Sequence, residues 1–506
     1  MFKNASSRWQ IIDQKVSEVL HIYRSSINDC LPRFILRDAT IHYENLPLVY
    51  PTIKRKCFAG QFDVFYFKDR AVPFQPIRTC DKSAHSCFRN IVSFASMPGA
   101  RQFRAVSRAI RHMISHTLHS YSIDNMSTVC DELQESFRDL MNNDNAGKCM
   151  SCQCSMCGPT AATWDAGQAY EVLNPTQVLR DLDHVCTRSE AAGSGLLQIW
   201  HSARSLVGFS KSLHRSLNDR VVLATRSIKS CVRAYMNMRI FRFCNIFVKQ
   251  ISGVPIGGWL SSALLNLSAS ACESRFEARY TQYPARHGFA LPRNRVFAIK
   301  RYEDDVLGIS HVLCPECLGE VVVQIYKPYI CMEPCNAHMK TSNGCTQNKF
   351  LDLIVHVTNS NISFDIFNCN QDFCVSGLAS HHVKHRFRPA LGSSNIIIDR
   401  LIANILTKRA RWQQIHLNSS DVVKHTVLDC SELLLLGYKP QQIQKAFYAA
   451  VAHDKFYAIC LHTVRTLMEN AIYLDLQWRM PRKIFDVMQS LYNIDPDYFP
   501  FDTYDL

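Results

Sequence analysis

Hydrophobic residues recur at helical spacing between positions 101 and 120. Val106, Ile110 and Ile114 stand four positions apart. The same segment carries four arginines: Arg101, Arg104, Arg108 and Arg111. This period predicts an amphipathic helix with a basic face. The basic face could be exposed to solvent or could face the phosphates of a nucleic acid. The pattern alone does not decide between these two alternatives.

The same patterns divide the rest of the chain. Residues 220–238 read as a helix, 241–250 as a hairpin, and 296–310 as a strand, an acidic turn and a second strand. An aromatic run at 62–67 resembles a strand, and 141–160 reads as a loop rich in cysteine. A short apolar helix is expected at 263–269, and mainly helices from about 380 onward.

Charge suggests the kind of partner. The 506 residues include 57 Lys and Arg against 43 Asp and Glu, a net charge of +14. An excess of this size favours a polyanion, either nucleic acid or an anionic membrane surface. No apolar run is long enough to span a bilayer, so we expect no membrane-embedded segment.

The 22 cysteines are spread through the chain rather than concentrated in a small scaffold. The polar and basic start, MFKNASSRWQ, has no apolar run after it and does not resemble a secretory signal. We therefore expect mostly reduced thiols in an intracellular protein that is not secreted, in the nucleus or the cytoplasm.

Two adjacent carboxylates, Asp304 and Asp305, follow Tyr302 and Glu303 at the predicted turn. Like charges this close repel each other unless a cation neutralises them. Hard divalent ions such as Mg²⁺ prefer carboxylate oxygens. A metal site and an exposed acidic hairpin turn are both compatible with this motif alone.

Two further segments supply what such a metal site would need. Asp165 follows a short apolar stretch and precedes Tyr170 by five positions. A glycine-rich loop with Gly253, Gly257 and Gly258 leads into the apolar helix, and glycine lets the backbone approach a ligand closely. The alternative for the loop is a turn that only caps a helix.

The order of these segments resembles motifs A, B and C of reverse transcriptases. Motif A, D-x-G-x-A-Y, is matched at 165–170, and motif C, Y-x-D-D, at 302–305. Motif B, Q-x-x-G-x-P-x-G-x-x-x-S, is matched at 250–261. Three matches in the right order make the resemblance specific.

Within this family the chain is most similar to Penelope-like retroelement enzymes, relatives of telomerase. Residues 241–250 resemble the hairpin before motif B, 350–355 the primer-grip region, and 388–440 the thumb. The fingers signature R-P-I appears only as Q-P-I-R ending at Arg78, and Ile256 replaces the usual Gln or Met. No segment resembles a GIY-YIG endonuclease.

The resemblance implies an α+β fold of the right-hand polymerase type, with fingers, an antiparallel-sheet palm and a helical thumb. It implies an N-terminal extension at 1–69, fingers and palm at 70–360, and a thumb and C-terminal region at 361–506. The implied activity is RNA-directed DNA polymerisation, which extends a primer 3′-hydroxyl with dNTPs. The implied partners are an RNA template and a DNA primer.

The resemblance also assigns roles to residues. The two Mg²⁺ or Mn²⁺ ions would be held by Asp165, the carbonyl of Ala166, Asp304 and Asp305. The nucleotide would be contacted by Tyr170, Gln250, Gly257, Gly258, Tyr302 and Arg78. Tyr170 would be the steric gate that excludes a 2′-hydroxyl. Lys340 or Lys349 would protonate pyrophosphate, and the sequence does not choose between them.

Two basic clusters fall in the predicted thumb: Lys384, Arg386 and Arg388, then Lys408, Arg409 and Arg411. Cations interspersed with aromatics suit phosphate contact and base stacking, so we expect these clusters to bind the RNA–DNA hybrid. Such a hybrid would be recognised by its shape and backbone.

Two cysteine groups have the C-x2-C spacing of structural Zn²⁺ sites. One comprises Cys149, Cys152, Cys154 and Cys157, and the other Cys314 and Cys317 with Cys331 and Cys335. Each is a candidate zinc site by itself, and the alternative is reduced, partly buried thiols.

Two rival functions remain. An RNA-dependent RNA polymerase shares the metal chemistry, although Tyr170 and the Y-x-D-D motif favour DNA synthesis. The second is a catalytically weakened descendant that only binds nucleic acid. The altered fingers motif leaves this alternative open, whereas the intact Asp165, Asp304 and Asp305 argue against it. Template, primer source and oligomeric state do not follow from the sequence.

Overall fold

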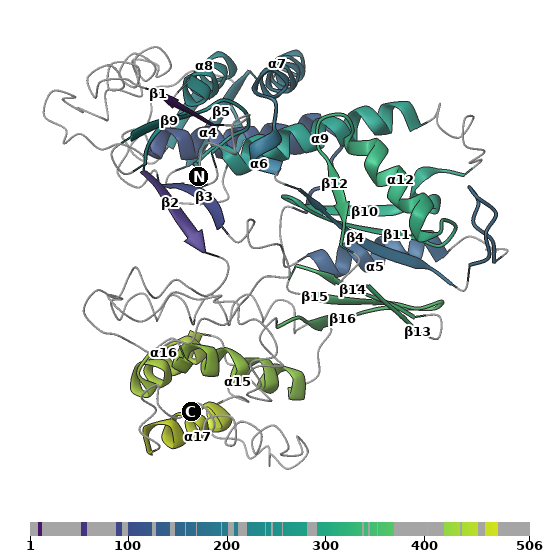
Figure 1. Ribbon diagram of the computed structural model, residues 1–506, viewed down its shortest axis with the longest axis vertical. Helices are drawn as coiled ribbons and strands as arrows, with labels where there is room; N and C mark the ends of the chain where they lie inside the picture. The colour runs from purple at the N-terminus through teal and green to yellow at the C-terminus, as the bar shows by residue number, and fades with distance from the viewer. Residues whose placement is uncertain are drawn as a thin grey trace, which may run out of the picture.

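The computed structural model describes residues 9–12, 52–57, 88–93, 100–123, 128–141, 147–156, 158–167, 169–193, 195–200, 207–210, 220–237, 239–243, 246–255, 257–280, 291–335, 339–342, 345–351, 353–368, 402, 419–435, 438–453 and 461–473. In these residues the chain combines helices with sheets that are almost entirely antiparallel (Figure 1). This agrees with the α+β class expected from the sequence.

A four-stranded antiparallel sheet occupies the centre of the described chain. Its order is β10 (Ala298–Tyr302), β11 (Asp305–Ser310), β4 (Thr160–Ala166) and β12 (Met332–Pro334). The hairpin of β10 and β11 confirms the predicted strand, acidic turn and strand. Apolar runs such as Val306 to Ile309 form these strands because both faces of the sheet are covered.

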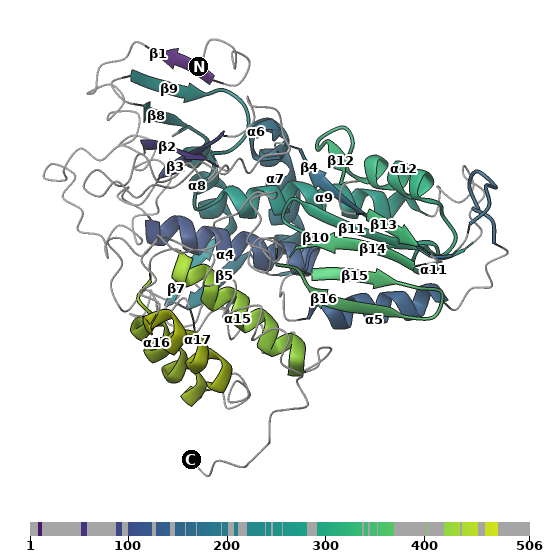
Figure 2. The same cartoon turned by 60° about the horizontal axis from the view of Figure 1, so that its bottom comes forward.

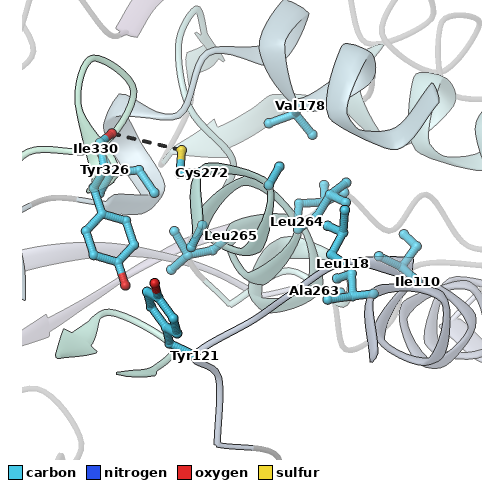
Figure 3. Packing of buried hydrophobic residues seen from close by; sticks show 14 of the residues in the cluster. Ile110, Leu118, Tyr121, Val178, Ala263, Leu264, Leu265, Cys272, Tyr326 and Ile330 are labelled. Carbon is cyan, nitrogen blue, oxygen red and sulfur yellow. Dashed lines mark hydrogen bonds between the residues drawn. The ribbon is translucent and has the colours of Figure 1, made fainter. Parts of the chain in front are cut away.

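Helices α9 (Ser261–Tyr280) and α12 (Pro315–Tyr326) pack on one face of this sheet. Four further helices pack on α9 or on one another: α4 (Ala100–Thr117), α6 (Ala169–Val172), α7 (Pro175–Ala191) and α8 (Thr225–Asn237). α4 confirms the amphipathic helix predicted at 101–120, and α9 extends the apolar helix predicted at 263–269. Figure 3 shows Leu264 and Leu265 of α9 packed among side chains of several of these segments. α9 is apolar or small on nearly all sides because other elements surround it.

The other face is covered by α5 (Val129–Met141), next to α11 (Arg293–Val296), and by a second sheet. The order of that sheet is β13 (Met339–Ser342), β14 (Cys345–Phe350), β15 (Leu353–Val357) and β16 (Ile362–Ile366). Buried and more exposed positions alternate along β15 and β16, so one face joins the core. Two layers thus enclose the central sheet.

A three-stranded sheet corrects one sequence prediction. It consists of β6 (Val207–Phe209), β5 (Leu196–Trp200) and β7 (Arg220–Ala224). Residues 220–224 were expected to begin a helix, but they pair with β5, and α8 starts only at Thr225. The adjacent β-branched Val221 and Val222 favour a strand over a helix.

The remaining described elements form a further sheet and a group of three helices. A fourth sheet, with five strands, is ordered β1 (Trp9–Ile12), β9 (Ile246–Gln250), β8 (Ile240–Phe243), β2 (Thr52–Cys57) and β3 (Phe88–Ser93). The hairpin of β8 and β9 confirms the prediction for 241–250.

Helices α15 (Ser419–Leu435), α16 (Pro440–His453) and α17 (Leu461–Tyr473) pack on one another (Figure 2). The run at 62–67 lies outside the described residues. Among the described helices, none has the length and apolar character needed to cross a membrane.

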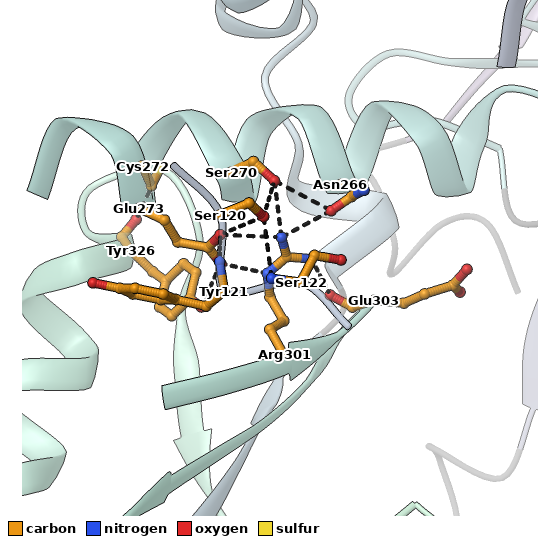
Figure 4. Close-up of polar contacts among 10 residues, drawn as sticks. All are labelled: Ser120, Tyr121, Ser122, Asn266, Ser270, Cys272, Glu273, Arg301, Glu303 and Tyr326. Carbon is orange, nitrogen blue, oxygen red and sulfur yellow. Dashed lines mark hydrogen bonds and ion pairs between the residues drawn. The ribbon is translucent and has the colours of Figure 1, made fainter. Parts of the chain in front are cut away.

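A fully buried ion pair joins β10 to α9. Arg301 Nε donates to Glu273 Oε1 at 2.5 Å, and Arg301 Nη2 donates to Asn266 Oδ1 at 2.8 Å (Figure 4). The Tyr326 hydroxyl and the Tyr121 backbone N–H also donate to the Glu273 carboxylate, at 2.8 and 2.9 Å. Both charged groups are therefore satisfied inside the core, as buried charges require.

The pairing changes the acid–base behaviour of Glu273. Burial by itself would raise the pKa of this carboxyl, but the charge and hydrogen bond of Arg301, together with the hydrogen bonds from Tyr121 and Tyr326, lower the pKa below its ordinary value. A carboxyl whose pKa is lower in the folded than in the unfolded protein stabilises the fold at pH values above its pKa in the unfolded protein. That contribution is lost as the pH falls through the lowered value.

We predict that Glu273→Ala lowers the free energy of unfolding by about 3–5 kcal/mol, because it leaves the Arg301 guanidinium buried and unpaired. Urea unfolding followed by tryptophan fluorescence measures the change. The control is Glu320→Gln, which removes an exposed charge from α12 and should stay within about 0.5 kcal/mol of the wild type. Equal effects of the two variants would show that the ion pair is dispensable.

Candidate active site

The register of β4 and β11 brings two of the predicted aspartates together. Asp165 lies directly opposite Asp305 in the antiparallel pair. Residues opposite each other project from the same face, with Cα atoms about 4.5–5.5 Å apart. The Ala166 backbone N–H donates to the Asp304 carbonyl at 2.9 Å, which ties the turn to the end of β4. Motif A and motif C therefore lie next to each other, at the same end of the central sheet.

A further carboxylate, not expected from the sequence, extends this row. Glu333 in β12 lies opposite Asp165 on its other side, so Asp305, Asp165 and Glu333 follow one another across three neighbouring strands. The Glu333 side chain also lies over Gly167, where a Cβ would overlap it. The sequence did not predict Glu333, because the short strand that carries it contains no recognisable motif.

The donor set at this end of the sheet suits a hard divalent cation. Asp165, Asp304 and Asp305 are each partly exposed, and all three offer carboxylate oxygens. Their placement follows from strand register and from the turn. For comparison, the described residues include one tight group of metal-ligating side chains, four cysteines at another place in the fold. The donor atoms of these cysteines all lie within 4.8 Å of one another. The aspartates do not form such a tight cluster.

Glu303, at the tip of the turn, links the aspartates to three other elements. Its φ of 53° places it in the left-handed region. The Tyr170 hydroxyl donates to Glu303 Oε2 at 3.1 Å, and Arg111 of α4 approaches Oε1 at 3.3 Å. Ser262 at the start of α9 also donates to Oε1. Figure 4 shows the Glu303 carboxylate extending away from the Arg301 network.

These contacts determine the state of Tyr170. Burial raises its pKa, and the negative charges of Glu303 and Asp304 raise it further. The phenol therefore stays protonated and donates to the Glu303 carboxylate. Its ring is held beside the acidic turn, five residues after Asp165 in the sequence.

The glycine-rich loop is hydrogen-bonded to the segment that follows β4. The Gly253 N–H donates to the Leu173 carbonyl at 2.9 Å, and the Val254 N–H donates to the Tyr170 carbonyl at 2.6 Å. Gly253 has a φ of 74°, and a Cβ there would overlap the backbone of Tyr170 and Glu171. Glycine is therefore required at this close approach. Motifs A and B are in direct backbone contact.

The end of the loop is fixed by a buried tyrosine. The Ser261 hydroxyl donates to the Pro255 carbonyl at 2.6 Å, and it pairs with the Tyr235 hydroxyl at 2.8 Å. A Cβ on Gly258 would overlap that tyrosine hydroxyl. Gly257 is exposed and has a φ of 91°, so its backbone is open to a ligand. The loop is rigidly supported on its inner side.

Gln250 and Arg239 support the loop from behind. Gln250 is almost completely buried, and its side-chain oxygen has no hydrogen-bond partner among the described residues. Arg239 Nη1 donates to the Gly253 carbonyl at 3.0 Å, and the Gln250 N–H donates to the Arg239 carbonyl at 2.8 Å. Arg239 was not expected from the sequence, because a lone arginine between a helix and a hairpin carries no motif.

Other predicted residues are placed as follows. Tyr302 ends β10 beside the turn and is partly exposed. Two arginines of α4 make contacts inside the protein. Arg111 contacts Glu303, and Arg108 donates to the Trp200 carbonyl at 2.8 Å. The Lys349 ammonium lies 4.0 Å from the centroid of the Phe367 ring. Arg78, Cys157, the Lys340 side chain and the six thumb cations (Lys384, Arg386, Arg388, Lys408, Arg409 and Arg411) fall outside the described residues.

The cysteines are grouped differently from the prediction. We expected each of the two sequence groups to form its own site, but the structure combines one pair from each: Cys149, Cys152, Cys314 and Cys317. Cys154 and Cys331 are exposed outside this set. Among the described cysteines this grouping differs from the predicted one. Four ligands within nine residues cannot easily surround one ion, whereas ligands from two separate loops can.

Comparisons with known proteins give no family assignment. No protein-family model matches the sequence, and no curated protein matches it. The chain is similar to telomerase from Candida albicans in complex with a TWJ fragment of telomeric RNA, at 14% identity and a TM-score of 0.42, over 97% of this chain and 72% of that one. It is similar to telomerase from Candida tropicalis with such a fragment, at 11% identity and 0.36, over 90% and 67%.

An RdRp complex is similar at 9% identity and a TM-score of 0.39, and this chain covers 27% of that one. These scores are too low for the likeness to carry an argument about this protein. The motifs and their geometry therefore carry the functional conclusion.

We predict that Gly258→Ala lowers the free energy of unfolding by about 1–3 kcal/mol, because the new methyl group overlaps the buried Tyr235 hydroxyl. Adding Tyr235→Phe should recover part of the loss. Urea unfolding measures both. The control is Gly195→Ala, where the nearest atom to the new Cβ is at an ordinary 3.5 Å. No recovery in the double variant would contradict the steric explanation.

Proposed function

We propose that this protein is a nucleotidyltransferase of the reverse-transcriptase type, which extends a primer 3′-hydroxyl on an RNA template with dNTPs. The observation that carries the proposal is the register of β4 and β11, with Asp165 opposite Asp305 beside the acidic turn. The backbone bonds between the glycine-rich loop and Tyr170 join the third motif to the same place. The three motifs are thus adjacent in space, which supports the proposal.

The proposal extends to finer points. The central sheet would be the palm, residues 70–360 would form fingers and palm, and residues 361–506 would include the thumb with its basic clusters. The closest functional class would be the Penelope-like, telomerase-related enzymes without an endonuclease. These points rest on the sequence motifs.

Asp165, Asp304 and Asp305, with the carbonyl of Ala166, would hold two divalent ions, and Glu333 is placed to join them. Bound Mg²⁺ would supply activation of the primer hydroxyl and neutralisation of the leaving pyrophosphate. The protein keeps the carboxylates in place by strand register and by the bond from Ala166 to Asp304. Such preorganisation is a main source of catalytic power.

Tyr170 and the loop would bind the nucleotide. The Tyr170 ring, held by its bond to Glu303, would lie beneath the sugar and leave no room for a 2′-hydroxyl. The exposed backbone at Gly257 would face the nucleotide and its template base. Gln250 is buried, so it would act by supporting the loop and not by contacting the nucleotide directly.

We predict that Asp165→Asn and Asp304→Asn each reduce primer extension at least about 100-fold, because each removes a charge that holds the catalytic ions. The measurement is incorporation of dNTPs on an RNA template with a DNA primer in Mg²⁺ or Mn²⁺. Glu320→Gln, an exposed charge change of the same kind, should retain wild-type activity. Robust extension by Asp304→Asn would refute the assignment of the metal site.

We predict that Tyr170→Ala reduces discrimination against rNTPs at least about tenfold, since the ring is removed from beneath the sugar. Tyr170→Phe keeps the ring and should keep most of the discrimination. Ratios of kcat/KM for matched dNTP and rNTP give the result. Equal discrimination in Tyr170→Ala and the wild type would mean that another residue excludes the 2′-hydroxyl.

The same assays separate the rival functions. Incorporation of rNTPs in preference to dNTPs by the wild-type protein would favour an RNA-dependent RNA polymerase. Binding of an RNA–DNA hybrid with no extension in any metal would favour a non-catalytic descendant.

A further inference from the structure

Two C-x2-C pairs from distant parts of the chain converge on one point. Cys149 and Cys152 lie in the loop before β4, and Cys314 and Cys317 lie at the start of α12, after β11. Cys152 and Cys314 are 162 positions apart in sequence, yet their Sγ atoms are 3.6 Å apart. All four Sγ atoms lie within 4.8 Å of one another.

This spacing suits a single tetrahedral ion. Sulfurs bound at about 2.3 Å to zinc in a tetrahedron are about 3.8 Å apart. The observed separations bracket that value without any sulfur–sulfur bond, since all four cysteines are free. Three of them are buried and Cys152 is exposed, so an ion would be enclosed on most sides and reachable from one.

The backbone around the sulfurs is arranged as in thiolate metal sites. The Cys314 N–H donates to Cys149 Sγ at 3.3 Å, and such bonds stabilise a negatively charged sulfur. Residues 147–156 fold back on themselves, with the Cys149 N–H donating to the Cys154 carbonyl at 2.8 Å. The Met150 N–H donates to the Val312 carbonyl at 2.8 Å, which joins this loop to the segment carrying Cys314.

From this geometry we infer that Cys149, Cys152, Cys314 and Cys317 form a structural Zn²⁺ site. Four thiolates without an open position favour zinc held for structure. The ion joins the start of β4 to the chain leaving β11, at Thr160 and Ser310, which pair in register. The opposite ends of these two strands carry Asp165 and Asp305. The zinc site thus fixes the two strands at the end remote from the acidic turn, and it stands independently of the proposed activity.

The test is zinc content and coordination in the purified full-length protein. We expect one tightly held zinc per chain, with a sulfur-only shell at about 2.3 Å in X-ray absorption. Replacement by Co²⁺ should give the visible absorption of a tetrahedral thiolate complex. Cys152→Ser, which changes an exposed residue, should weaken zinc binding at least about tenfold, and so should Cys317→Ser.

The matched controls are Cys154→Ser and Cys331→Ser, two exposed cysteines from the same two sequence groups that lie outside the cluster. Both should keep the wild-type zinc affinity. The circular dichroism spectrum of Cys152→Ser should match that of the wild type. A match would show that the variant folds, so that its loss of zinc binding is not a loss of structure.

Several results would overturn the site. Wild-type protein that binds no zinc, or Cys152→Ser that binds it as tightly as the wild type, would do so. Equal losses in Cys152→Ser and Cys154→Ser, with wild-type affinity in Cys317→Ser, would indicate a site within the first group alone. A disulfide between Cys152 and Cys314 in protein alkylated under denaturing conditions would assign these thiols to a covalent link instead.

Discussion

The buried ion pair between Arg301 and Glu273 is the interaction on which the candidate site depends. Arg301 lies two residues before Glu303 of the acidic turn, and its guanidinium also donates to the Glu303 carbonyl at 3.2 Å. One side chain therefore fixes the turn to α9, whose first turn carries Ser262 next to Glu303. A buried pair need not stabilise a fold more than apolar residues would, but breaking it leaves a charge without a partner. Its main effect here is to fix position.

The position matters because the turn concentrates negative charge. Glu303, Asp304 and Asp305 are consecutive, Asp165 is their neighbour across the strands, and Glu333 is one strand further. Arg111 offsets part of this charge by contacting Glu303. A cation held by the aspartates would offset the rest, whereas the chain as a whole carries +14. The local acidity runs against the global charge, as expected for a metal centre that acts on a polyanion.

The sequence predicts those parts of the fold that have a local signal. The helix at 101–120, the hairpins at 241–250 and 296–310, and the order of the three motifs all follow from short-range pattern. The strand at 220–224 was missed, because its apolar run also fits a helix; the local preference of Val221 and Val222 for a strand is weak, and pairing with β5 decides. Glu273 looks like any helical glutamate, and its buried partner comes from another segment. Glu333 and the combined cysteine cluster likewise depend on strand neighbours that no local pattern reveals.

The central claim is that Asp165 and Asp305, brought together by strand register, hold the same divalent ion. A double-mutant cycle on Mn²⁺ affinity tests it most directly, by calorimetry with a primer–template that cannot be extended and the matching dNTP. If the two carboxylates share an ion, Asp165→Asn and Asp305→Asn should each weaken Mn²⁺ binding, and the double variant should be little worse than either. Losses that simply add, or no loss in either single variant, would contradict the shared site.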